Sequence, residues 1–221
     1  MNGQTRAPHF EPRWPVALAI LAVIFLLVVL PDRIRLFPMW ATYVVGLVVL
    51  VPIVAIGLTA AKTQWLRVER VVILSFFVVA GAITLANLAN LINAMVNRSA
   101  QIDGLQLLTS SIALWITNVL IFSMLYWQID RGGPEARVND ARARADWLFP
   151  QEGAPAEDMP HGWHPNFIDY LYLGFSTATA FSTTDAMPLT PRAKLLMMLE
   201  STISLMTIVI VASRAINILG N

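Results

Sequence analysis

The sequence contains no cysteine and few charged residues. The absence of cysteine excludes disulfides, thiolate zinc sites and iron–sulfur clusters, and we expect no cofactor. Charged residues make up 13% of the chain, against about a quarter in soluble domains, and the formal net charge of +1 provides no basic surface for nucleic acid. Hydrophobic residues reach 57%. This balance excludes a soluble globular fold, and we expect an integral protein of a bacterial plasma membrane with lipid as its surroundings.

Long uncharged runs predict an all-α membrane fold with five transmembrane helices. The first four runs cover residues 14–31, 36–61, 71–96 and 104–129. At 1.5 Å per residue the last three are long enough to cross about 30 Å of hydrocarbon, and the first is marginal but sufficient. The fifth run, residues 195–213, contains one carboxylate, Glu200. Pro31, Asp32 and Arg33 follow the first run in place of a small-residue cleavage site, so we expect a retained helix and not a signal peptide.

One long hydrophilic stretch, residues 130–165, separates the fourth run from the fifth. Its four arginines and seven acidic residues give a net charge of −3. Such mixed charge is typical of a solvated loop, although residues 137–147 also fit a short amphipathic helix. His161 and His164 stand three residues apart, but no further ligands accompany them, so a metal site is not expected.

Residues 166–191 combine a helix start with a polar continuation that breaks the helix. Asn166 is a favourable N-cap, and Asp169 stands three residues later, where a carboxylate completes a capping box. Pro188 and Pro191 would interrupt a helix that continued. A helix of about 15 residues reaches about 22 Å, and polar irregular backbone is tolerated at membrane depth only inside protein or beside water. The pattern predicts a re-entrant segment between the fourth and fifth spans.

The same stretch carries polar residues at a distinctive spacing. An Asp, two residues and a Tyr are followed by spaced threonines, an Asp and a Pro-x-Thr; these positions are Asp169, Tyr172, Thr177, Thr179, Asp185, Pro188 and Thr190. The spacing resembles the pore domain of tetrameric potassium channels, in which a re-entrant pore helix and filter lie between two helices. Lys194 and Glu200 match a basic residue and a frequent glutamate of that family's inner helix. The resemblance covers about 50 residues, 166–216, together with the fourth span as outer helix.

The resemblance implies a division of the chain and a homotetramer. Residues 1–98 would form three N-terminal transmembrane helices, and residues 99–221 a pore-like domain. That domain would comprise an outer helix, a hydrophilic loop, a pore helix with a filter-like segment, and an inner helix, at residues 104–129, 130–165, 166–191 and 192–216.

The filter itself departs from the family. Where potassium channels have Thr-Val-Gly-Tyr-Gly, this chain has Ala180, Phe181, Ser182, Thr183 and Thr184. The lost glycines allow conformations that cost other residues about 1–2 kcal/mol each, so a potassium-type cage of carbonyls is not expected. Instead the hydroxyl groups after Phe181 would form rings that favour monovalent cations, with Phe181 as a hydrophobic gate. Asp185 is either an outer acidic ring or a carboxylate that supports the backbone.

Polar residues within the expected spans are further candidates. Glu200 is the single carboxylate inside a span, which favours a functional role, with hydrogen bonds to pore-helix hydroxyl groups as the alternative. Ser204 lies one turn later. Four asparagines of the third span fall within about 120° of one helix face, which favours helix packing with Ser111 and Asn118 as partners; they are Asn87, Asn90, Asn93 and Asn97.

We therefore expect a cation-conducting membrane protein with a filter unlike that of potassium channels. Two alternatives remain: a proton-coupled transporter that uses Glu200 and the asparagine row, and a nonconducting scaffold derived from a channel fold. The spans contain no Ser/His pair, paired aspartates or metal-ligand cluster, so an enzyme is not expected.

The orientation in the membrane has two readings. The resemblance places the loop and filter outside, and counting back through four spans places the N-terminus there too. The positive-inside rule favours the reverse, because nine basic residues would then lie inside and three outside. Either the pore element is inverted relative to the family, or residues 167–184 span the membrane and give six helices with both termini inside.

Overall fold

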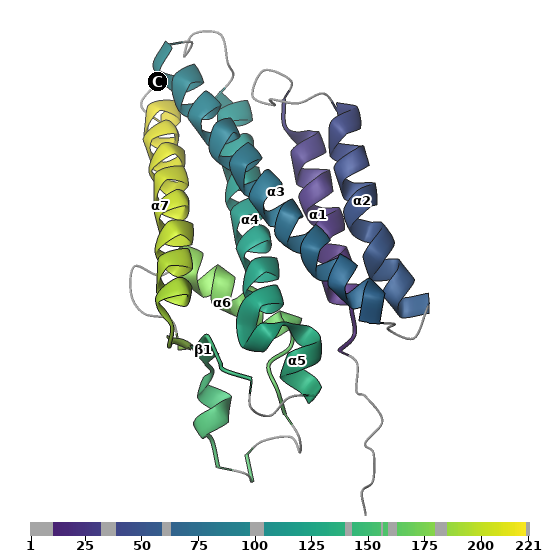
Figure 1. The fold of residues 1–221 in the computed structure, drawn as a ribbon. Helices are drawn as coiled ribbons and strands as arrows, with labels where there is room; N and C mark the ends of the chain where they lie inside the picture. Colours follow the sequence, from purple (N-terminus) through teal and green to yellow (C-terminus); the bar gives the residue numbers. More distant parts are fainter. Residues whose placement is uncertain are drawn as a thin grey trace, which may run out of the picture.

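The structure is a computed structural model that describes residues 11–31, 39–58, 63–97, 104–139, 143–155, 157–158, 163–179 and 185–219. Within this part of the chain, long helices run up and down side by side (Figure 1). They are α1 (Trp14–Val29), α2 (Met39–Leu58), α3 (Thr63–Asn97), α4 (Gly104–Ile129) and α7 (Pro191–Leu219). The shorter elements are η1 (Asp130–Gly132), α5 (Pro134–Asn139), β1 (Trp147–Leu148), η2 (Pro150–Gly153), α6 (Phe167–Thr179) and β2 (Met187–Pro188).

Three helices of the described residues are long and apolar enough to cross a bilayer. They comprise Arg70–Asn93, Leu105–Gly132 and Pro191–Ile210. These segments overlap the third, fourth and fifth predicted spans, so a mostly helical fold with helices that could span a membrane is confirmed. The first two predicted spans are the helices α1, of 16 residues, and α2, of 20 residues. That these two helices also cross the membrane stays a prediction.

Helix α4 lies at the centre of the bundle. It contacts α1, α3, α6 and α7. Its hydroxyl side chains donate to carbonyls four residues earlier on the same helix, at 2.7–2.8 Å for Ser110, Ser111, Thr117 and Ser123. Because these hydroxyl groups are satisfied locally and their side chains are small, neighbouring helices can enclose them without leaving the hydroxyl donors unpaired in an apolar interior.

The start of α6 and the strand that follows it, β2, lie at the same end of the bundle. Strand β1, which precedes α6, pairs antiparallel with β2, which follows it, with Trp147 opposite Pro188 and Leu148 opposite Met187. The backbone N–H of Leu189 also donates to the carbonyl of Asp146 at 2.8 Å. Figure 1 shows this pair at the end where α4 finishes and α7 starts, with α6 rising obliquely across those helices. Thirteen residues of α6 extend ~20 Å, and the chain is back at its starting end by β2.

The prediction that residues 130–165 form a solvated loop is wrong for the described residues nearest the helices. Arg137, Asp146 and Trp147 are all buried. The alternative of an amphipathic helix over 137–147 does not hold beyond its start either, because α5 ends at Asn139 and β1 begins at Trp147. Arg137 and Asp146 are buried together with oppositely charged partners, Glu11 and Arg192. A count of net charge along the sequence does not reveal such pairing.

Candidate functional site

The first turn of α6 carries the capping box that the sequence predicts. The Asn166 side-chain Oδ1 accepts a hydrogen bond from the backbone N–H of Ile168 at 2.9 Å. Asp169 reaches back, and its Oδ2 accepts from the backbone N–H of Asn166 at 2.8 Å. Burial raises the pKa of Asp169, opposed by the hydrogen bond from Asn166. This reciprocal pair fixes where α6 begins, so the structural role expected for Asp169 is confirmed.

A carboxylate from the N-terminal segment meets the same helix end. The Oε1 atom of Glu11 accepts from the backbone N–H of Phe167 at 3.1 Å and from the indole of Trp127 at 2.7 Å. Its Oε2 accepts from the Arg137 guanidinium at 2.9 Å. A carboxylate at a helix N-terminus is stabilised by the free N–H groups and by the helix dipole. Sequence reasoning missed Glu11, although it is the only acidic residue before the first span.

Arg137 connects the ends of α4 and α6. Its Nη1 donates to the carbonyl of Trp127 and to the hydroxyl of Tyr170, both at 3.1 Å, and the guanidinium lies 4.8 Å from the centroid of the Tyr170 ring. The Tyr170 hydroxyl in turn donates to Asp130 Oδ2 at 2.5 Å. Burial and the Asp130 charge raise the pKa of Tyr170 well above its usual value, against the opposing effect of Arg137, so the hydroxyl stays a donor.

A second ion pair fixes the start of α7. Asp146 Oδ1 accepts from the Thr190 hydroxyl at 2.5 Å and from Arg192 Nε at 2.6 Å, and its Oδ2 pairs with Arg192 Nη2. The backbone N–H of Asp146 donates to Asp130 Oδ1 at 2.7 Å, which joins the two sets. We call the whole network the end cluster; it consists of Glu11, Asp130, Arg137, Asp146, Tyr170 and Arg192. The end cluster thus ties the start of α6 and the start of α7 to the end of α4.

The described filter candidates fall in three different environments. Thr177 is buried, and its hydroxyl has no hydrogen-bond partner among the residues that the structure describes. Thr179 is exposed and donates to the carbonyl of Phe175 at 2.8 Å. Asp185 is exposed, and its carboxylate accepts a hydrogen bond from the Tyr172 hydroxyl at 3.2 Å. This bond links α6 to the residues just before β2. The remaining candidates lie outside the described residues; they are Ala180, Phe181, Ser182, Thr183 and Thr184.

The two inner-helix candidates both face α4. Glu200 is fully buried, and its Oε2 accepts a hydrogen bond from the Tyr126 hydroxyl at 2.5 Å. The Asn118 amide donates to Ser204 Oγ at 2.9 Å and to the backbone carbonyl of Glu200 at 3.2 Å. Asn118 therefore joins α4 to α7, and the prediction that it serves the asparagine row is wrong for these hydrogen bonds. Ser111 donates within its own helix to the carbonyl of Leu107.

The asparagine row does not face one environment. Asn87 is buried and its Oδ1 has no partner among the described residues, whereas Asn93 is exposed. The side chain of Asn97 lies outside the described part. Neither a continuous polar path nor a continuous packing seam follows from these positions.

Gly174 allows α6 to approach α4 closely. A Cβ atom at this position would lie 2.4 Å from Ser123 Oγ, 3.3 Å from the carbonyl oxygen of Val119 and 3.4 Å from Glu200 Oε1. The first distance is far below any normal contact, so a side chain would have to displace α6 or the serine. Three oxygens from α4 and α7 thus surround the backbone of α6 at this point.

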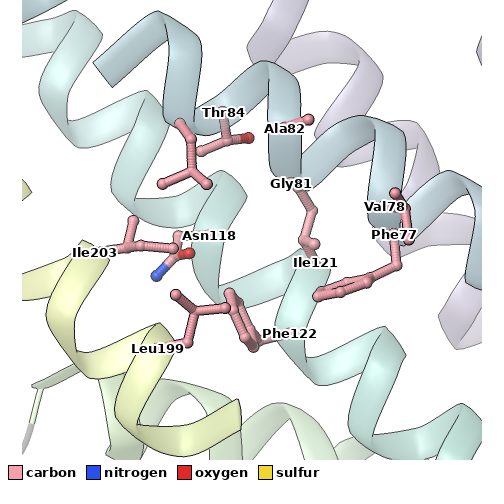
Figure 2. A pocket seen from close by; sticks show the side chains of 11 residues that line it. Phe77, Val78, Gly81, Ala82, Thr84, Asn118, Ile121, Phe122, Leu199 and Ile203 are labelled. Atoms are coloured by element: carbon pink, nitrogen blue, oxygen red, sulfur yellow. The ribbon is translucent and has the colours of Figure 1, made fainter. Parts of the chain in front are cut away.

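A pocket of about 270 Å³ lies between α3, α4 and α7. Figure 2 shows Phe77 and Gly81 on α3, Phe122 on α4 and Leu199 on α7 around it, with Asn118 beside them. The lining is apolar apart from Thr84 and Asn118. This composition does not suit an ion or a charged ligand.

Metal ligands do not gather anywhere in the described chain. No group of three or more His, Cys, Asp or Glu side chains able to hold a metal ion occurs among those residues. His161 lies outside them. Comparisons with protein-family models, curated proteins and solved structures find no match to this chain.

Proposed function

We propose that this chain is a pore-forming membrane protein that conducts monovalent cations as a homotetramer built from α4, α6 and α7. The observation that carries the proposal is the path of the chain around α6. The helix starts at the capping box of Asn166, and β2 has already returned to β1 at Met187. With α4 and α7 as spans, the segment between would enter the membrane and leave it on one side, as a pore loop does.

The direction of α6 supports selectivity for cations. Its N-terminus is held by Glu11 of the end cluster and by Asp169 of the capping box, which both accept from backbone N–H groups. Its C-terminal end at Thr179 therefore lies away from this cluster and carries about −0.5 charge from the helix dipole. Four such ends around an axis favour a cation between them. The hydroxyl-rich residues from Ser182 to Thr184 follow directly in the sequence.

The uncovered faces of α6 and α7 support assembly. One face of α6 repeats exposed side chains every three or four residues, at Ile168, Tyr172, Phe175 and Thr179. Helix α7 has a similar exposed row, at Leu195, Met198, Thr202, Leu205 and Val209. One copy cannot enclose a pore, and polar backbone after α6 must be hidden from lipid. Neighbouring copies packed along these rows would do both.

The five-span arrangement belongs to the same proposal. Glu11 contacts the first turn of α6, so the chain before α1 lies at the end-cluster side of the bundle. Four successive spans then bring the end of α4 back to that side, where Asp130 joins the end cluster. Helices α1 and α2 would complete the membrane domain beside α3.

Ion flux into liposomes tests the proposal. Purified wild-type protein is expected to carry cation flux, and Thr184→Tyr is expected to block it by filling the pore. Thr109→Tyr is the matched control, because Thr109 is exposed on α4 outside the proposed pore, and its flux should equal wild type. Leak equal to that of empty liposomes would contradict conduction, and crosslinking that stops at dimers would contradict the tetramer.

A further inference from the structure

Glu200 is a buried carboxyl group that neither the end cluster nor the proposed pore loop uses. Its relative exposure is 0%, and it lies between α7, α4 and α6. One carboxyl oxygen, Oε2, accepts from Tyr126 at 2.5 Å. The other, Oε1, is buried without a hydrogen-bond partner among the described residues. An ionised carboxylate in an apolar interior requires more donors than one phenol hydroxyl.

No positive charge is placed to compensate Glu200 within the described residues. None of their ion pairs includes it. The titratable group that faces it from α4 is Tyr126, and on α6 the only acidic residue is Asp169, engaged in the capping box. Helix α3, which also contacts α7, has no charged residue between Val71 and Asn97. On α7 the nearest basic residues are Arg192, paired with Asp146, and the exposed Lys194.

The hydroxyl of Ser123 lies in the same region as Oε1 but makes no hydrogen bond to it in the structure. The position that a Cβ atom would take at Gly174 lies 3.4 Å from Glu200 Oε1 and 2.4 Å from Ser123 Oγ. The Ser123 hydroxyl donates its own hydrogen to the carbonyl of Val119 at 2.7 Å, so its oxygen still has a lone pair available. A carboxyl group that holds a proton can donate to such an oxygen, whereas a carboxylate cannot.

We propose that Glu200 is a proton-binding site between α4, α6 and α7, with the proton on Oε1, the carboxyl oxygen that receives no hydrogen bond from the described residues. Tyr126 donates to Oε2 of the neutral group. A proton neutralises the buried charge without requiring further donors or oxygens around the carboxyl group.

The site couples proton binding to the position of α6. Loss of the proton would leave an uncompensated charge on Oε1, 3.4 Å from the Cβ position of Gly174. Water would have to enter between α6 and α4, or α6 would have to move. The same face of α6 carries the buried Thr177 one turn later, and its carbonyl accepts from Ser201 of α7 at 3.1 Å. Proton binding at Glu200 does not require that the protein conducts ions.

Infrared difference spectroscopy of the protein in lipid nanodiscs at neutral pH tests the site. We expect the C=O stretching band of a protonated carboxyl, shifted in D2O and by ¹³C-labelled glutamate, and lost in Glu200→Gln. The matched control is Glu157→Gln, which removes an exposed glutamate and should leave the band unchanged. Absence of a band that depends on glutamate labelling would overturn the proposal, as would its loss on addition of sodium.

Tyr126→Phe keeps the carboxyl group and tests its partner. This variant removes the hydrogen bond to the C=O of Glu200, so the band should move to higher frequency without disappearing. It also tests the site if Glu200→Gln does not fold. A band at the wild-type frequency in Tyr126→Phe would contradict the assigned partner and with it the site.

Discussion

The carboxylate of Glu11 and the guanidinium of Arg137 form an ion pair of 2.9 Å between residues 126 positions apart. Both side chains are almost completely buried, at 1% and 0% exposure. Glu11 also accepts from the first backbone N–H of α6, and Arg137 from α5 reaches the end of α4. One pair thus fixes the N-terminal segment, α4 and α6 relative to one another.

Removing one partner of this pair should be strongly destabilising. Glu11→Gln leaves the buried Arg137 charge without its carboxylate, and we expect a loss of about 3–5 kcal/mol in the free energy of unfolding. Denaturant unfolding in detergent, followed by circular dichroism, measures it. Glu157→Gln, at an exposed position, is the control and should change stability by less than about 0.5 kcal/mol. Equal stability of both variants would show that the pair does not hold this end together.

Tyr170 should stay protonated at alkaline pH. Burial raises the pKa of its hydroxyl well above the ordinary value of about 10, because the phenolate would be desolvated beside Asp130. The neutral form is favoured more in the folded protein than in the unfolded chain, so this contribution to stability is fully present below the unfolded pKa of about 10 and is lost as the pH rises from there through the folded pKa. The ultraviolet tyrosinate signals of wild type and Tyr170→Phe should therefore coincide up to pH of about 10. An extra tyrosinate signal from wild type in that range would contradict the buried hydrogen bond to Asp130.

The N-cap of α6 should contribute about 1 kcal/mol. Asn166→Ala removes the acceptor for the backbone N–H of Ile168 and should lower the free energy of unfolding by about 0.5–2 kcal/mol, whereas Asn166→Ser should retain most of it. Asn139→Ala, at an exposed position on α5, is the comparison and should have little effect. Thermal unfolding of the four proteins measures the differences. An alanine variant as stable as the serine variant would rule out the cap.

The contact between Gly174 and Ser123 should behave as a coupled pair. Gly174→Ala places a methyl group 2.4 Å from Ser123 Oγ, and we expect overpacking to cost about 1–3 kcal/mol. Adding Ser123→Ala removes the obstructing oxygen and should recover part of the loss. A double-mutant cycle of unfolding free energies measures this coupling. Additive effects would mean that α6 does not approach α4 closely at Gly174.

The features that the sequence predicted are those with local causes. The capping box of α6 depends on Asn166 and Asp169, three residues apart, and the structure has both hydrogen bonds. The long apolar runs predict helices because their length and composition are properties of one segment. The resemblance to a potassium-channel pore is carried by spacing alone, and its filter positions 180–184 lie outside the described residues.

The features that the sequence did not predict depend on distant partners. Arg137 was expected in a solvated loop, but Glu11 and Tyr170 make its burial possible. Asn118 has helical spacing to Ser111, yet its partner is Ser204, 86 positions away on α7. Charge counts and periodicity describe single segments, so they cannot indicate which segments meet.

Cysteine labelling tests the return of the chain around α6 most directly. The chain has no natural cysteine, so single variants Asp158→Cys, Met187→Cys and Ser213→Cys each report one exposed position. In sealed vesicles, a membrane-impermeant thiol reagent should label positions 158 and 187 from the same side and position 213 from the opposite side. Labelling of position 187 from the side of position 213 would mean that the segment crosses the membrane, and would contradict the pore-loop arrangement.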